Sequence, residues 1–269
     1  MTALPDCETL QLEQNQSVLH VTLNRPDSRN AMSLAMVTEL RSVFDAIRED
    51  TGVRAVVLRG TGGHFCAGGD VKDMASARSQ KAEDGEDPFF SLNRAFGYLL
   101  CEVEQAPQTT VAVIEGAVMG GGFGLVCVSD IALAHSEAKF GLPETSLGIT
   151  PAQIAPFVVR RIGLTQARRL ALTGHRFSGE EALSLGLVHE CATSDEELEQ
   201  ALATTLDRVR HCAPNASRMT KQLLLSVESE PLESLLDSAA KDFAAAIRSE
   251  EGQEGTMAFV QKRKPSWAE

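Results

Sequence analysis

Residues 64–74 read HFCAGGDVKDM, and residues 114–125 read IEGAVMGGGFGL. Each glycine cluster comes after a short apolar run, 55–58 and 111–114, that predicts a buried strand, and before sequence that favours a helix. A strand–glycine–helix junction leaves backbone N–H groups free at the helix N-terminus, and glycine lets a ligand approach them. Two such junctions side by side predict an oxyanion hole with its donors near Gly69 and Gly121.

One glycine cluster alone is a weak signal, because a tight turn or close helix–strand packing explains it equally well. The two common nucleotide-binding loop motifs are absent from both clusters. The sequence has no G-x-x-x-x-G-K-[ST] motif, and neither cluster fits G-x-G-x-x-G.

Strand and helix patterns alternate around these junctions. Residues 18–23 (VLHVTL) and 131–134 also predict strands, and apolar residues at helical spacing predict a helix over about 33–49, with Ser33 as a plausible N-cap. The charged segment 78–88 has no apolar period and predicts a surface loop. The fold class is therefore α/β.

The last quarter of the chain changes character. After His189 the pattern is almost wholly helical, over 198–209, 217–227 and 232–248. We therefore expect an α/β core over residues 1–195, which holds the ligand site, and a helical oligomerisation domain over residues 196–269.

Composition limits the class of function. The 269 residues carry a net charge of −12, which argues against a nucleic-acid surface but permits an anionic small ligand. No apolar run has the length of a membrane span, and the N-terminus does not resemble a secretory signal. The six cysteines form no C-x-x-C pair and the six histidines no H-x-x-x-H pair. We expect reduced cysteines, no metal site and a cytoplasmic location.

Several motifs together resemble the crotonase (enoyl-CoA hydratase/isomerase) superfamily in order and spacing, over about residues 10–264. Besides the two glycine segments, they are VTLNRPDSRNAM (21–32), SDIALAHSEAKFGLPETSLGI (129–149), TGHRFSGEEALSLGLVHE (173–190) and AFVQKRK (258–264). The resemblance implies a spiral of ββα units followed by a helical trimerisation region. It also implies a homotrimer or a dimer of trimers, and a coenzyme A thioester as substrate, with no separate cofactor.

The resemblance also assigns residues. It places the oxyanion donors at the amides of Gly69 and Gly121. The residues that match coenzyme A-binding positions in the first glycine segment and the preceding loop are Ser28, Arg29, Ala67, Gly68, Asp70 and Val71. Phe259 and Lys262 match a C-terminal helix that reaches the coenzyme A of a neighbouring subunit. Asp70 in a turn is also typical of a local cap.

The carboxylates bear on the reaction. Hydratases of this family typically carry two glutamates, and the second is present here as Glu144 in FGLPE, whereas Gly124 stands at the position of the first. A single carboxylate leaves three possibilities: Glu144 handles both protons in turn, another side chain helps, or the reaction needs only one base. Gly124 either leaves room for a branched or long acyl chain, or simply fits helix packing.

The segment TSLGITPAQIAPFVVRRIG (145–163) resembles bacterial glutaconyl-CoA hydratases, and within them the isohexenylglutaconyl-CoA hydratases of acyclic terpene (citronellate) breakdown. The leading hypothesis is therefore hydration of a branched glutaconyl-CoA thioester, whose free carboxylate needs a cation. Arg160 and Arg161 are candidates, although solvated helix-surface charges are the more typical reading.

Two other functions remain open on the sequence. An enoyl-CoA isomerase needs only one glutamate, to move a proton between Cα and Cγ. A non-catalytic scaffold that binds coenzyme A or RNA is the other, and the acidic charge and the presence of Glu144 weaken it.

Overall fold

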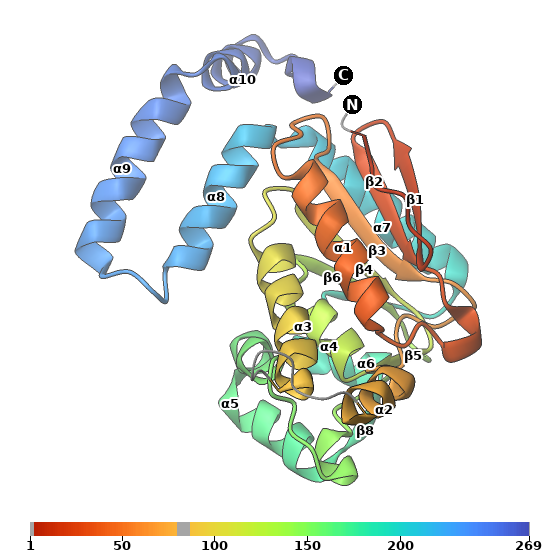
Figure 1. Ribbon diagram of the computed structural model, residues 1–269. Helices are drawn as coiled ribbons and strands as arrows, with labels where there is room; N and C mark the ends of the chain where they lie inside the picture. Colours follow the sequence, from red (N-terminus) through yellow and green to blue (C-terminus); the bar gives the residue numbers. More distant parts are fainter. Residues whose placement is uncertain (1–2, 80–86, 269) are drawn as a thin grey trace.

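The computed structural model describes residues 3–79 and 87–268, which form an α/β core and a helical extension (Figure 1). The larger sheet has six strands in the order β1-β2-β3-β4-β6-β9. Their bounds are Leu10–Asn15, Val18–Leu23, Ala55–Gly60, Thr109–Ile114, Ile131–His135 and Glu190–Ala192. Among the described strands of this sheet, β1 and β2 pair antiparallel, and the other neighbouring strands pair parallel. The central strands are apolar because both faces of the sheet are covered.

A smaller sheet contains β5 (Ala117–Met119), β7 (Lys139–Gly141) and β8 (Arg176–Ser178), in that order. The chain passes from the large sheet into the small one and then into a helix. It does so from β4 through β5 to α4 (Gly121–Val128), and from β6 through β7 to α5 (Ala155–Thr173). These are the expected ββα units, and the α/β class is confirmed.

One face of the large sheet is covered by α1 (Leu34–Ile47) and α3 (Pro88–Glu104), which pack against each other. The side chain of Ser33 caps α1 by accepting the N–H of Met36, as the sequence predicted. Of the predicted surface loop 78–88, residues 80–86 lie outside the described residues. Residue 79 ends α2 (Val71–Ser79), and Pro88 begins α3.

The opposite face of the sheet is covered by α7 (Asp195–His211). Leu198, Leu202 and Leu206 of this helix are buried in one cluster with strand residues such as Val57 and Val113. The predicted boundary between residues 195 and 196 assigned α7 to the extension. By its packing α7 belongs to the core, because it completes the second hydrophobic layer.

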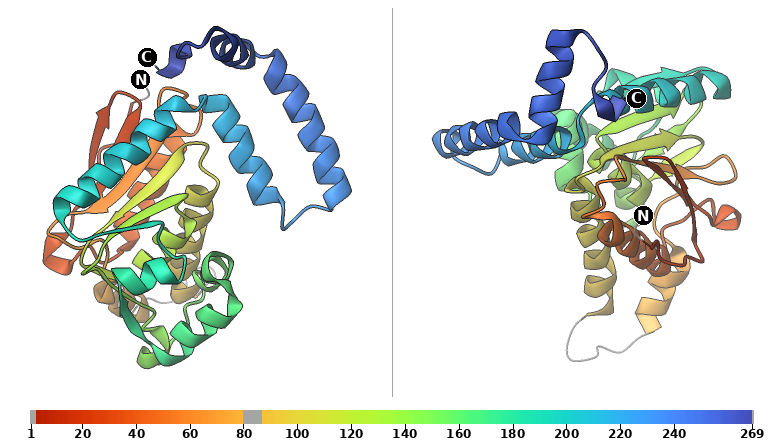
Figure 2. Two further views of the ribbon diagram at one scale, coloured as in Figure 1. Left: turned by 180° about the vertical axis from the view of Figure 1, so that it is seen from behind. Right: turned by 90° about the horizontal axis from the view of Figure 1, so that it is seen from above.

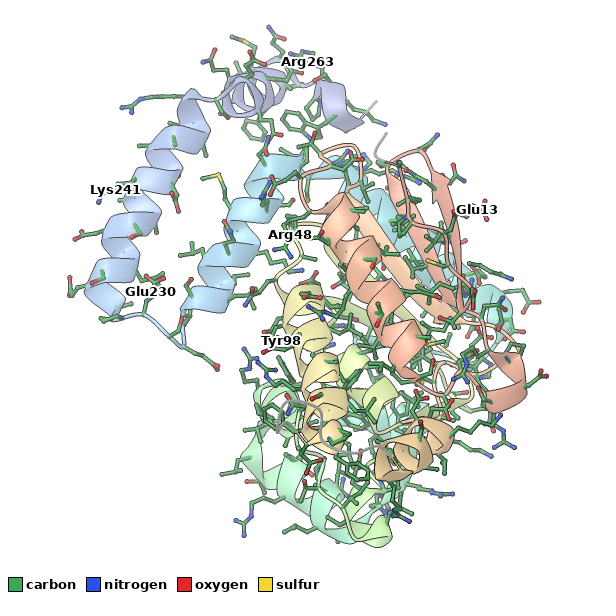
Figure 3. The ribbon with its side chains drawn as sticks, viewed as in Figure 1. Glu13, Arg48, Tyr98, Glu230, Lys241 and Arg263 are labelled. Atoms are coloured by element: carbon green, nitrogen blue, oxygen red, sulfur yellow. The ribbon has the colours of Figure 1, made fainter. Side chains whose placement is uncertain are left out.

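The helices that leave the core are α8 (Pro214–Ser226), α9 (Leu232–Arg248) and α10 (Glu250–Gln261), and Figure 2 shows them standing apart. Figure 3 places Glu230 and Lys241 along this extension. Many large apolar side chains of these helices are exposed in the single chain, namely Leu224, Val227, Leu232, Leu236, Phe243, Ile247, Met257, Phe259 and Val260. Among the described residues, no helix is long and apolar enough to cross a membrane.

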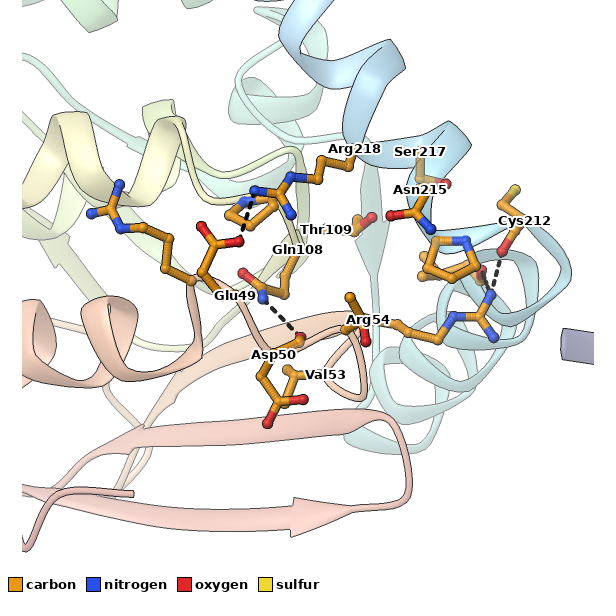
Figure 4. Close-up of a pocket in the computed structure, with 15 residues that line it drawn as sticks. Glu49, Asp50, Val53, Arg54, Gln108, Thr109, Cys212, Asn215, Ser217 and Arg218 are labelled. Carbon is orange, nitrogen blue, oxygen red and sulfur yellow. Dashed lines mark hydrogen bonds and ion pairs between the residues drawn. The ribbon is translucent and has the colours of Figure 1, made fainter. Parts of the chain in front are cut away.

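The base of the extension is held by polar side chains of the core (Figure 4). Arg54 donates to the carbonyls of Val209, Arg210 and Cys212 at the end of α7, and to that of Trp267. Lys221 of α8 forms an ion pair with Asp130 at 2.7 Å. The bonds from Arg54 satisfy carbonyls that a helix end leaves unpaired.

The short elements that remain are α6 (Gly179–Ser184) and three 3₁₀ helices, Pro26–Ser28, Glu144–Leu147 and Ser266–Ala268. The second of these begins with the glutamate that the sequence singled out. This 3₁₀ helix begins three residues after the end of β7, the middle strand of the small sheet.

Candidate active site

The two glycine junctions lie side by side because the segments that lead into them pair in register. Cys66 forms a parallel bridge with Val118, and the N–H of Met119 donates to the carbonyl of Cys66 at 2.9 Å. Gly69 and Gly121 each come three residues after this bridge. The two segments are also close beyond it, since a Cβ on Gly120 would lie 3.8 Å from Cα of Gly68.

The amides of Gly69 and Gly121 are available to a ligand. Within the described parts of the chain, neither N–H donates to a protein acceptor, although the amides of Asp70, Gly120 and Gly124 around them do. Gly121 is the first residue of α4, so its N–H points out of the helix N-terminus, where negative charge is favoured. The pair has the chemistry of an oxyanion hole.

Glu144 lies at the same junction. A Cβ on Gly120 would come within 2.7 Å of Glu144 Oε1, which places the carboxylate against this glycine, and the backbone of Gly120 at φ 48° and ψ −109° favours glycine there. Glu144 Oε2 is buried and has no hydrogen-bond partner in the described residues. Burial raises the pKa of the Glu144 carboxyl, against a backbone hydrogen bond that lowers it. A raised pKa suits a group that takes up and returns a proton.

Backbone hydrogen bonds join the loop that contains Ser28 and Arg29 to the first glycine segment, which contains Gly69. The N–H of Ala67 donates to the carbonyl of Arg29 at 3.0 Å, and Gly69 forms a bridge with Met32. Ser28 is half-buried and Arg29 is exposed. Of the other predicted residues, Gly68 and Asp70 are buried and Val71 is exposed.

Gly124 does not face open space. A Cβ there would lie 2.5 Å from Ile154 Cγ2, 3.3 Å from Ile154 Cβ and 3.5 Å from Leu100 Cδ1. Both of these side chains are buried. The expectation that Gly124 enlarges the acyl pocket is therefore wrong, and the alternative, a glycine that permits close packing, is what the structure shows. The sequence did not signal Ile154, because the contact joins α4 to the start of α5.

Ile154 is held in that place by its neighbour. Gln153 packs against Gly97 of α3, and its amide donates to Asn93 Oδ1 at 3.0 Å. Arg94 donates to Gln153 Oε1 at 3.3 Å. Both Gln153 and Ile154 belong to the segment 145–163, on which the resemblance to glutaconyl-CoA hydratases rests.

Two apolar side chains next to the amides were not predicted. The Met74 methyl group lies 2.8 Å from the position of a Cβ on Gly69, and the Phe96 ring lies 3.3 Å from that of a Cβ on Gly121. Met74 is 38% exposed and Phe96 is half-buried. No motif in the sequence assigns a role to either residue. Tyr98, which Figure 3 labels, lies on the same helix as Phe96. The guanidinium carbon of Arg94 lies 3.9 Å from the centroid of the Tyr98 ring.

The remaining candidates lie elsewhere. Arg160 forms an ion pair with Glu104 at 3.0 Å, and Arg161 donates to the carbonyls of Leu187 and Ser129. Both arginines therefore have protein acceptors, which does not favour them as the cation for a substrate carboxylate. Phe259 and Lys262 lie on and just after α10, at the opposite end of the molecule from α2 (Figure 1). A single chain does not bring them to the glycine junctions.

The chain is similar to known proteins over nearly its whole length. Residues 13–269 match the enoyl-CoA hydratase/isomerase family. A solved structure of Pseudomonas aeruginosa AtuE is 65% identical and superposes with a TM-score of 0.95, covering 97% of this chain and 100% of that one. A probable enoyl-CoA hydratase of Bacillus subtilis is 35% identical over 263 residues, 96% of this chain and 98% of its own length.

A 2,3-dehydroadipyl-CoA hydratase of Escherichia coli is 31% identical over 259 residues, 96% of this chain and 98% of its own length. The chain belongs to the enoyl-CoA hydratase/isomerase family. Members of this family act on acyl-CoA thioesters. The fold, with its two sheets and C-terminal helices, matches that of the solved structures.

Proposed function

We propose that the protein is a hydro-lyase that adds water across the α,β double bond of an enoyl-CoA thioester. The observation that carries the proposal is the buried Glu144 Oε2, which has no hydrogen-bond partner in the described residues, at the same junction as the two free amides of Gly69 and Gly121. This chemistry requires no cofactor, because the coenzyme A thioester is itself the substrate. Glu144 is the acid–base group, and the two amides hold the thioester oxygen.

The proposed reaction has two proton transfers. Glu144 takes a proton from water as the water oxygen bonds to Cβ of the substrate. The electron pair of the double bond moves onto the thioester oxygen, where the amides of Gly69 and Gly121 stabilise the enolate. Glu144 then returns the proton to Cα, and the enolate collapses to the 3-hydroxyacyl thioester.

For the substrate we propose a branched glutaconyl-CoA, of which isohexenylglutaconyl-CoA in acyclic terpene catabolism is the leading candidate. The support is the 145–163 segment, which resembles hydratases of that type, and the likeness to a hydratase whose name specifies a dicarboxylic thioester. Met74 and Phe96 offer apolar surface to a hydrocarbon branch next to the amides.

We also propose that the active unit is a homotrimer or a dimer of trimers. The exposed apolar residues of α8, α9 and α10 need a cover, since a large apolar patch on a monomer is unusual. Phe259 is 86% exposed in the single chain. Together with Lys262 it would complete the coenzyme A site of a neighbouring subunit.

A second candidate is an enoyl-CoA isomerase, which the single carboxylate favours. Ile154 fills the space at Gly124, so no second acid–base group stands at that position. One glutamate is sufficient to move a proton between Cα and Cγ.

The test is a turnover screen with straight, branched and carboxylated 2-enoyl-CoA and 3-enoyl-CoA thioesters, read by mass spectrometry. The hydratase proposal expects the mass of one water to be added, with the highest kcat/KM on a branched, carboxylated substrate. A shifted double bond without change of mass on every substrate would support the isomerase instead. Binding without turnover would leave only the scaffold.

A further inference from the structure

The ion pair between Arg25 and Asp70 joins the two halves of the proposed site. Asp70 directly follows the oxyanion residue Gly69, and Arg25 precedes the loop that contains Ser28 and Arg29. Arg25 Nη2 lies 2.7 Å from Asp70 Oδ2, and the Asp70 side chain is only 7% exposed. A charge-assisted bond that is this short and this buried fixes its partners firmly.

Arg25 also holds the loop itself. Its Nη1 donates to the carbonyl of Ala31 at 2.6 Å, while its backbone N–H donates to Asn30 Oδ1 at 2.8 Å. Arg29 and Asn30 both have positive φ, 51° and 56°, which costs free energy in residues other than glycine. The buried Asn30 amide compensates by donating to the carbonyls of Thr61 and His64.

Asp70 fixes the first glycine segment, on the other side of the ion pair from the loop. Its Oδ1 accepts the N–H of Lys72 at 2.7 Å, at the start of α2. Its own N–H donates to Met32, whose N–H donates to Gly68. Gly69 therefore lies between two backbone bonds to Met32 and directly before a carboxylate that cannot rotate freely. Burial raises the pKa of Asp70, but the bonds from Arg25 and Lys72 outweigh it and lower the pKa overall, so the carboxylate stays charged.

We propose that Arg25 and Asp70 are positioning residues: their ion pair holds the Gly69 amide at the thioester oxygen and links its position to the loop proposed to bind coenzyme A. This inference rests on the proposed oxyanion role of Gly69. In this proposal Asp70 acts through the backbone of Gly69, since its two oxygens are bonded to Arg25 and to the Lys72 N–H, and contact with the ligand is not needed for its role. Its effect is on the direction of one N–H, which matters most in the transition state.

The test compares Asp70→Asn with Glu102→Gln in the full-length protein. Asn keeps an oxygen for the Lys72 N–H but loses the charge that binds Arg25. Glu102→Gln removes the ion pair of Arg41 and Glu102, of similar length at 2.8 Å, which joins α1 to α3 away from the amides. We expect kcat of Asp70→Asn to fall by about 10- to 100-fold, the effect of misplacing one group by about 1 Å. Glu102→Gln should leave kcat unchanged.

Two further readouts separate positioning from general stability. The dissociation constant of free coenzyme A should change less than about threefold in Asp70→Asn, well under the tenfold that corresponds to about 1.4 kcal/mol. A bound cinnamoyl-CoA chromophore, which absorbs at longer wavelength when its carbonyl is polarised, should lose part of that shift. An unchanged kcat, or a lower kcat with a full chromophore shift, would overturn the inference.

If Asp70→Asn does not fold, Arg25→Lys carries the same test. Lysine keeps the charge but reaches only one of the two acceptors, Asp70 and Ala31. The expected lower kcat and smaller chromophore shift, and the results that would overturn the inference, are the same. If the wild type hydrates no enoyl-CoA, the proposed function fails, and the chromophore shift in each variant still decides this inference.

Discussion

The contact between Gly124 and Ile154 gives a quantitative prediction about the stability of the site. In Gly124→Ala the new methyl group would lie 2.5 Å from Ile154 Cγ2, about 1 Å closer than two carbon atoms ordinarily approach. Overpacking of this kind costs about 1–3 kcal/mol, and the better helix propensity of alanine offsets about 1 kcal/mol. The single variant should therefore lose about 0–2 kcal/mol of unfolding free energy.

Ile154→Ala alone should cost about 2–5 kcal/mol, because Ile154 is 4% exposed and its removal leaves a cavity. In the double variant the 2.5 Å contact with Ile154 Cγ2 is gone, and the closest remaining neighbour of the new methyl group is the Cβ of residue 154 at 3.3 Å, so most of the clash is relieved. We therefore expect the combined cost to be smaller than the sum of the two single costs by about 1–3 kcal/mol, within the range measured for residues in contact.

The assay is urea unfolding of the wild type, both single variants and the double variant, at one protein concentration, with equal m-values as the condition for comparison. Gly124→Ala combined with Ile162→Ala is the control, because Ile162 is a buried isoleucine of α5 that is not among the atoms closest to Gly124. That pair should be additive. Additivity within about 0.5 kcal/mol for the Ile154 pair as well would refute the packing described here.

Four other predictions concern the rest of the molecule. Burial raises the pKa of Glu144, so the charged carboxylate is disfavoured in the folded protein, and ionised Glu144 lowers the stability as the pH rises through that pKa. Glu144→Gln should therefore raise the melting temperature at pH 7 but not at pH 4, which scanning calorimetry at both pH values checks. The same raised pKa predicts that kcat/KM of the wild type falls on the acid side with a midpoint above the ordinary glutamate value; a midpoint at or below that value would contradict the assignment of Glu144. Arg54→Met should lose about 2–3 kcal/mol in urea unfolding, since the carbonyls at the end of α7 lose a charged donor, whereas the exposed Arg48→Met should lose less than about 0.5 kcal/mol. Phe243→Asp, on an α9 position that is 70% exposed, should shift the protein from trimer to monomer in light scattering without loss of helix content, and an unchanged mass would exclude α9 from the interface.

Much of the fold follows from local sequence pattern. The strands at 18–23 and 111–114 are apolar enough, and the helix that Ser33 caps is long and periodic enough, to be predicted. The strands β5, β7, β8 and β9 have three residues each, which is too short for a period to be visible. The helix α7 looks like part of a continuous helical tail, and only its contacts with the sheet show that it belongs to the core.

The site likewise contains some residues that the sequence reveals and others that only the structure reveals. Gly69, Gly121 and Glu144 stand in motifs, so the sequence singles them out, and their segments lie close together in the structure. Ile154 and the pair of Arg25 and Asp70 act through contacts between distant segments, which no single stretch of sequence reveals. Gly124 illustrates the difference: a missing side chain predicts space, but a neighbour from another helix fills it.

The role of Glu144 is tested most directly by following one 2-enoyl-CoA thioester in ¹⁸O-labelled water with the wild type and Glu144→Gln. Glutamine keeps the size of the side chain but cannot accept a proton from water. We predict that the wild type forms a 3-hydroxyacyl thioester that carries ¹⁸O, and that Glu144→Gln forms it about 10²- to 10⁴-fold more slowly, the usual contribution of a general base. Equal rates of ¹⁸O incorporation by the two proteins would contradict the mechanism.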